Sequence, residues 1–102
     1  HAHNNLGVVY MDMGLWDDAF QEISKSLSIK PDFVEARYNL GTYYKHLGFH
    51  NKAIEELEAA RYYAPDNPEI INAIGVLFLK VGNMKRCMSY GISHYLVDIV
   101  IY

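Results

Sequence analysis

The sequence has little cysteine, no surplus of positive charge and no long apolar run. Its 102 residues contain one cysteine, Cys87, which excludes a disulfide within the chain and a zinc site built from several cysteines. The net charge at pH 7 is −3, so no basic surplus is available for a nucleic-acid backbone, and we expect no nucleic-acid partner. Because no run of about 18 apolar residues occurs, we also expect no membrane span.

The composition is that of one small folded domain. Hydrophobic residues make up 51% of the chain and charged residues 21%, which argues against a disordered segment. The chain begins at His1 rather than Met, so we expect a fragment of a longer protein, with a leader upstream left open. One unpaired cysteine fits a reducing compartment, and we therefore expect a cytoplasmic protein.

The sequence repeats with a period of 34 residues. Glycines recur at this spacing in two sets, and small, aromatic, apolar and proline positions follow it as well. The sets are Gly7, Gly41 and Gly75; Gly14, Gly48 and Gly82; Ala19, Ala53 and Cys87; Tyr10, Tyr44 and Phe78; Leu6, Leu40 and Ile74; and Pro31 with Pro65. A fixed period of this length is typical of repeat architectures. We expect one domain over residues 1–102, with repeats at about 1–33, 34–67 and 68–102.

Each period predicts two helices. Apolar residues in the first half of a period are spaced by four and then three, as in Leu6, Tyr10 and Met13, which is one face of an α-helix. A glycine then follows, as is common at helix C-termini. The predicted helices are 2–13, 17–30, 34–47, 51–63, 68–81 and 84–97. The fold class is therefore all-α.

Two helix starts carry capping signals. Asp32 and Glu35 have the spacing of a capping box ahead of the third helix. Asn67, Pro68 and Glu69 place an N-cap residue, a first-turn proline and an acid in order ahead of the fifth helix.

A glycine also stands inside the first helix of each period, at Gly7, Gly41 and Gly75. Such a glycine costs about 1 kcal/mol relative to Ala. A cost repeated in every period predicts that paired helices approach closely at these positions.

These residues resemble the tetratricopeptide repeat family over essentially the whole chain. The matching residues are Asn5, Leu6, Gly7, Tyr10, Gly14, Trp16, Ala19 and Pro31 in the first period; Asn39, Leu40, Gly41, Tyr44, Gly48, Ala53 and Pro65 in the second; and Ile74, Gly75, Phe78 and Gly82 in the third. The resemblance implies a right-handed α-solenoid of three tandem antiparallel helix pairs, whose first helices line a concave groove. It also implies a protein-interaction module or scaffold that binds a peptide or a partner helix, with no enzymatic activity and no cofactor.

The resemblance further indicates which side chains face the groove. Those expected to contact a peptide are Asn5, Val8, Tyr38, Asn39, Thr42, Lys45, His46, Val76 and Lys80. A side-chain amide offers a donor and an acceptor, so Asn5 and Asn39 are expected to hold a peptide backbone. The alternative is that these asparagines are solvated or locally bonded.

The other groove candidates leave similar alternatives open. Tyr38 either packs against a ligand side chain or packs against its neighbouring helix. Lys45, His46 and Lys80 either form a mildly basic part of the groove, suited to an acidic partner, or form a solvated face.

Some family members clamp the acidic tails of heat-shock chaperones with basic residues beside asparagines. Asn39 fits that pattern, but Asn4 stands where a lysine is expected, and Glu69 and Ala73 stand where further basic residues are expected. Losing these cations removes most of the carboxylate binding, so we do not expect this ligand.

The sequence contains no pattern that indicates metal binding or catalysis. Of the five histidines, His46 and His50 are four residues apart, but Gly48 between them is expected to end the helix. No HExxH motif accompanies them, so we expect surface histidines and no metal site. Cys87 replaces an alanine at a helix contact and is expected to be a buried small hydrophobe. We assign no catalytic residue.

Residues 90–102 carry one charge, Asp98, where solenoids normally end in a polar capping helix. Three alternatives follow: packing onto a further repeat of a longer protein, contact with a second copy, or a poorly ordered terminus. Contact with a second copy would give a homo-oligomer and would make the chain a self-assembly module. The side chains expected at such a contact are Tyr95, Leu96, Ile99 and Tyr102.

Overall fold

A computed structural model describes residues 1–82 of the chain. This part contains five α-helices and no strand: α1 (Ala2–Asp12), α2 (Trp16–Ile29), α3 (Val34–His46), α4 (His50–Tyr63) and α5 (Pro68–Lys80). Each agrees with its predicted helix to within one residue at either end, which confirms the all-α prediction. The predicted helix 84–97 and the expected oligomer contacts at Tyr95, Leu96, Ile99 and Tyr102 lie outside the described residues.

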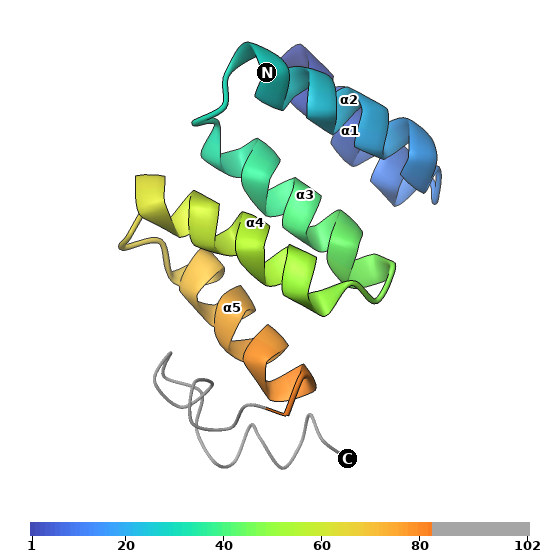
Figure 1. Cartoon of the computed structure of the whole chain (residues 1–102). Coiled ribbons are helices and arrows are strands. Elements are labelled where there is room, and N and C mark those ends of the chain that lie inside the picture. Colours follow the sequence, from blue (N-terminus) through green and yellow to red (C-terminus); the bar gives the residue numbers. More distant parts are fainter. Residues whose placement is uncertain (83–102) are drawn as a thin grey trace.

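Consecutive helices pack side by side and form a row that runs from α1 to α5 (Figure 1). In addition, α1 contacts α3, although α2 separates them in the sequence. The first helices of neighbouring pairs therefore lie next to each other, as in an α-solenoid.

The predicted glycine stops are confirmed. Gly14 and Gly48 both have positive φ, 78° and 83°, which is the left-handed conformation that glycine adopts without strain. After α1, the Gly14 N–H donates to the Met11 carbonyl and the Leu15 N–H donates to the Tyr10 carbonyl. This pair of bonds is the Schellman motif, and the same pair recurs after α3 around Gly48.

The two capping predictions had different outcomes. Asn67 caps α5 as predicted, since its Oδ1 accepts hydrogen bonds from the backbone N–H groups of Glu69 and Ile70. The capping box at Asp32 was wrong: the N-cap residue of α3 is Phe33, and no side chain caps this helix. Phe33 is buried in the core. Burying an aromatic side chain is worth about 1.5–3 kcal/mol, more than the typical cap at about 1 kcal/mol, so core packing sets where α3 begins.

The core of residues 1–82 has two large clusters, each formed where one repeat meets the next, and a small third one around Leu79 on α5. Between α2 and α3 the buried residues are Ile23, Leu27, Phe33, Ala36, Leu40 and Tyr43. Between α4 and α5 they are Ala53, Leu57, Ala60, Ile70, Ile74 and Leu77. Each repeat thus buries its apolar surface against its neighbour.

Close helix contact at the mid-helix glycines is confirmed for the first two pairs. A Cβ placed on Gly7 would lie 2.7 Å from Ile23 Cγ1 on α2, and one placed on Gly41 would lie 3.0 Å from Leu57 Cγ on α4. Ala19 and Ala53, the small residues on the second helices, have no exposed surface. Within each pair, the repeated glycine therefore leaves the room that the second helix fills.

Candidate functional site

A pocket with a volume of about 390 Å³ opens beside the first helices of the three repeats. Its lining comes from α1, from α3 and from the start of α5. The lining residues are Asn4, Asn5, Val8, Val34, Glu35, Tyr38, Asn39, Asn67, Glu69 and Ile70. The lining thus comes from the first helices, on which the sequence predicts the peptide contacts.

Two asparagines form the centre of the pocket. Asn4 on α1 is 2% exposed, and its Oδ1 accepts a hydrogen bond of 2.9 Å from Nδ2 of Asn39 on α3. The sequence predicts that Asn39 acts together with Asn5, which has the same position in its repeat. In the structure Asn5 is exposed at the pocket, and the bonded partner is its neighbour Asn4.

The bond between Asn4 and Asn39 uses the oxygen of the Asn4 amide and the nitrogen of the Asn39 amide. No hydrogen bond from Asn4 Nδ2, and none to Asn39 Oδ1, forms with another group of residues 1–82. Among residues 1–82, the one fully buried side-chain nitrogen or oxygen without a partner is His50 Nδ1. Asn4 Nδ2 is therefore not sealed from solvent, and Asn4 lines the pocket. The linked amides therefore present a hydrogen-bond donor and an acceptor side by side.

Tyr38 packs against a neighbouring helix, which is one of the two roles that the sequence left open. It lines the pocket, and its ring also packs against the α4–α5 cluster that contains Ile70 and Ile74. Its backbone carbonyl accepts a hydrogen bond of 3.2 Å from the Thr42 hydroxyl. The wall of the pocket at Tyr38 is therefore held by the core.

The pocket brings together four of the predicted groove residues, namely Asn5, Val8, Tyr38 and Asn39. The other predicted residues do not line it. Thr42 bonds to Tyr38, and the ring of His46 stacks on Trp16 with centroids 3.8 Å apart. Val76 packs against Leu79, and Lys45 and Lys80 are exposed. The stacking with His46, together with packing on the α2–α3 cluster, gives Trp16 a structural role.

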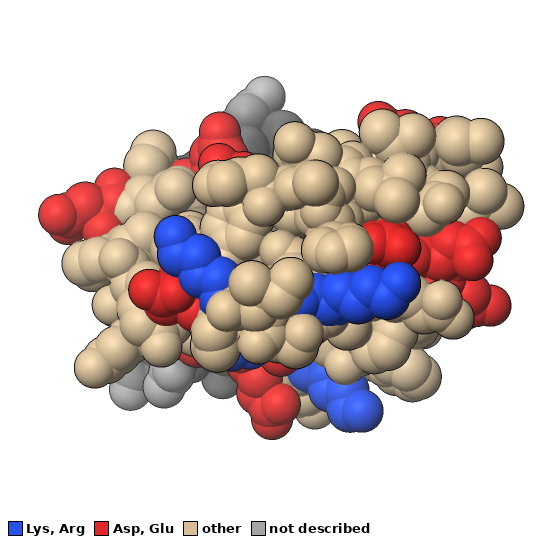
Figure 2. All heavy atoms as spheres, turned by 90° about the horizontal axis from the view of Figure 1, so that it is seen from above, with Lys and Arg blue, Asp and Glu red and all other residues tan. Residues whose placement is uncertain are grey.

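The charge at the pocket is acidic. Glu35 in the first turn of α3 and Glu69 in the first turn of α5 both line it, and no Lys, Arg or His is among the described lining residues. Elsewhere both signs occur: Figure 2 shows acidic and basic side chains on one face, with most of the acidic ones toward its rim. The mildly basic groove considered from the sequence therefore does not describe this pocket.

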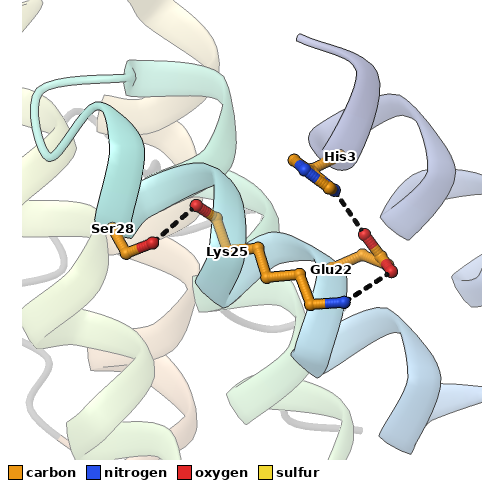
Figure 3. A network of polar contacts seen from close by, with 4 residues as sticks. All are labelled: His3, Glu22, Lys25 and Ser28. Atoms are coloured by element: carbon orange, nitrogen blue, oxygen red, sulfur yellow. Dashed lines mark hydrogen bonds and ion pairs between the residues drawn. The ribbon is translucent and has the colours of Figure 1, made fainter.

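A second polar group joins α1 to α2 away from the pocket (Figure 3). Glu22 lies 2.7 Å from His3 Nδ1 and accepts a hydrogen bond of 3.3 Å from Lys25 Nζ, while Ser28 donates to the Lys25 carbonyl. The hydrogen bond with His3, and the bond and charge of Lys25, lower the pKa of Glu22, although partial burial acts in the opposite direction. In the next repeat, Arg37 and Glu56 occupy the equivalent positions and form an ion pair of 3.0 Å. The repeated bridge indicates a structural role.

Within residues 1–82, no three His, Cys, Asp or Glu side chains gather in a way that would hold a metal ion. No helix in the same range has the length and apolarity needed to cross a membrane.

Comparison with known proteins identifies the family. The family model described as tetratricopeptide repeat matches residues 10–77. The chain belongs to the tetratricopeptide repeat family. No curated protein matches the chain.

Several solved structures share the tetratricopeptide fold of this chain. A crystal structure of MamA protein superimposes with a TM-score of 0.83 at 24% identity, covering 87% of this chain and 49% of that one. A second MamA structure gives a TM-score of 0.77 at 21% identity, covering 95% of this chain and 58% of that one. This chain thus spans about half the length of the MamA chains that it matches, and the likeness concerns the fold.

Proposed function

We propose that this tetratricopeptide repeat chain binds an extended peptide segment of a partner protein in the pocket of α1, α3 and α5. The fold supports a protein-interaction module in general. The pocket volume lies within the range of ordinary ligand sites, roughly 300–1,000 Å³.

The observation that carries this proposal is the linked amide pair of Asn4 and Asn39. Each residue of a peptide backbone has one N–H donor and one carbonyl acceptor, and in an extended segment these two groups of the same residue point to the same side. Asn4 Nδ2 retains donors and Asn39 Oδ1 retains acceptor capacity, so the pair complements the carbonyl and N–H of one extended residue of any sequence. Because Asn4 is largely buried, a hydrogen bond from its Nδ2 to a ligand carbonyl would form in a setting of low dielectric, where it is stronger than in water.

The walls of the pocket supply the apolar contacts. Val8, Val34 and Ile70 line it together with the Tyr38 ring, which offers a large apolar face and a hydroxyl. A peptide side chain that enters beside the amide pair would therefore bury apolar surface on α1 and α3, since Ile70 of α5 is itself only 1% exposed. The backbone contact would give affinity, and these walls would give selectivity.

A random-sequence peptide library tests the proposal. The library is screened on the wild-type chain and on a Tyr38→Ala/Asn39→Ala variant, with far-UV circular dichroism confirming that both stay helical. We expect peptides that are enriched on the wild type and lost on the variant. Lys45→Ala is the matched control, because Lys45 lies on the same helix outside the pocket, and it should retain the same peptides. Equal enrichment on the wild type and the pocket variant would rule out the pocket as the binding site.

The alternative function, self-assembly, has one structural observation in its favour. Leu6, Val9 and Met13 are exposed together along one face of α1. The tail residues first considered for such a contact lie outside the described part of the chain. Particle mass measured for the wild type and for a chain that lacks residues 96–102 tests the tail, and the mass of a Val9→Glu variant tests α1. A monomer in all three cases would exclude self-assembly.

A further inference from the structure

We infer that the pocket selects a segment carrying a lysine or arginine side chain, whose charged group lies by Glu35 and Glu69. This inference rests on the proposed function and names the chemistry of the peptide. The sequence suggested an acidic partner, whereas this inference names a basic one. The reason is that the cations expected in the groove do not line the pocket, and two glutamates do.

The acidic character comes from the same position in two successive repeats. Glu35 and Glu69 are 34 residues apart, and each lies in the first turn of a first helix. An acid in the first turn also stabilises its own helix. In this chain, however, both carboxylates are exposed and line one pocket, so both are available to a ligand.

The cations of α3 and α5 do not neutralise this pair. Lys45 and Lys80 lie in the last turns of these helices, and at 1.5 Å per residue each is about 15 Å from the acid of its own helix. That distance exceeds the Debye length of about 8 Å at physiological ionic strength. Arg37 is closer, but its guanidinium bonds to Glu56 and to the Pro31 carbonyl. The negative charge at the pocket is therefore left for a ligand.

The buried amide of Asn4 is an independent sign that the pocket takes a ligand. Asn4 lines the pocket, and its Nδ2 finds no acceptor within residues 1–82, so this donor suits a peptide carbonyl. The Tyr38 ring and the Val34 side chain line the same pocket and suit the aliphatic stem of a lysine or arginine. One residue of a bound segment would thus use the amide through its backbone, the apolar wall through its stem and the carboxylates through its head.

The experiment starts from peptides enriched on the wild-type chain in the random library. For each peptide, dissociation constants are measured by fluorescence anisotropy at low salt before and after lysine is replaced by norleucine, or arginine by citrulline. The same peptides are measured on Glu35→Gln/Glu69→Gln and on a control, Asp17→Asn/Asp18→Asn. The control removes two exposed first-turn acids of α2 that do not line the pocket, so the change in net charge is matched.

We expect the enriched peptides to share a lysine or arginine. Neutralising it should weaken binding about tenfold on the wild type and on the control, as expected for two partly solvated charge pairs, and less than about twofold on Glu35→Gln/Glu69→Gln. Enriched peptides without a basic residue, or an equal loss on all three proteins, would overturn the inference and leave the proposed function standing. If no peptide is enriched on the wild type, both fail.

Discussion

Leu6 on α1 and Leu40 on α3 occupy equivalent positions in successive repeats, yet Leu6 is 39% exposed and Leu40 is 7% exposed. The same contrast holds one turn further along, where Val9 is 50% exposed and its counterpart on α5, Leu77, is 1% exposed. The reason is the neighbouring helix. The α2 helix covers this face of α3 and α4 covers that of α5, whereas no described helix covers that of α1. The burial of a position in this fold is thus decided by the adjacent repeat rather than by the residue itself.

The largest expected effect is the loss of stability when the two equivalent leucines are replaced by alanine. Leu40→Ala should lower the free energy of unfolding by about 3 kcal/mol, because it leaves a cavity in the α2–α3 cluster. Leu6→Ala removes the same atoms from a half-covered site and should cost about 1 kcal/mol or less. Urea unfolding followed by circular dichroism measures both. An equal loss of stability for the two variants would contradict the exposure of Leu6 on α1.

The second prediction compares how tightly α1 packs against α2 and how tightly α3 packs against α4. In Gly7→Ala the new methyl group meets the inflexible part of Ile23 at 2.7 Å, so overpacking should exceed the gain in helix propensity and destabilise the chain by about 1 kcal/mol. In Gly41→Ala the contact with Leu57 is 3.0 Å, and the two effects should cancel to within about 0.5 kcal/mol. Thermal unfolding of both variants gives the order, and a stabilised Gly7→Ala would contradict the packing described for α1 and α2.

The third prediction compares the starts of α5 and α3. Asn67→Ala removes the two hydrogen bonds at the start of α5 and should cost about 1 kcal/mol. Asp32→Ala should change stability by less than about 0.5 kcal/mol, since Asp32 is exposed and makes no cap. Chemical unfolding checks the pair. A larger loss for Asp32→Ala would restore the capping box that the structure contradicts.

The smallest effect concerns the two equivalent bridges, His3 with Glu22 and Arg37 with Glu56. The pKa of Glu22 is lowered below its ordinary value near 4.5 in the folded chain, so its contribution to stability is present above about pH 4.5 and is lost as pH falls through the folded pKa. Glu22→Gln should therefore lose less stability than the wild type when pH is lowered from about 5 to about 3. Unfolding curves across this range test it, with Glu55→Gln as a control on an exposed site. Parallel curves for wild type and Glu22→Gln would exclude the contribution.

The sequence predicts the helices of residues 1–82 well, because the 34-residue period and the glycine stops act locally. It predicts the pocket in part. The resemblance identifies the helices that line it, so Asn5, Val8, Tyr38 and Asn39 are found, but the position of a side chain along its helix decides whether it reaches the pocket.

Two features of the structure depend on how neighbouring helices sit against each other. The hydrogen bond between Asn4 and Asn39 joins positions 35 residues apart, off the period by one. The burial of Phe33 shifts the start of α3 away from Asp32. Periodicity within one sequence fixes neither the relative placement of two helices nor the outcome of a competition between a cap and the core.

The most direct test of the account follows the side-chain amide signals of Asn4 and Asn39 in a ¹⁵N NMR titration with a peptide enriched on the wild-type chain. We predict that both side-chain amides shift in proportion to the bound fraction, together with backbone signals at the starts of α3 and α5. Shifts confined to the exposed face of α1 around Leu6, Val9 and Met13, with the two asparagine amides unmoved, would contradict the account and place the binding surface on that face.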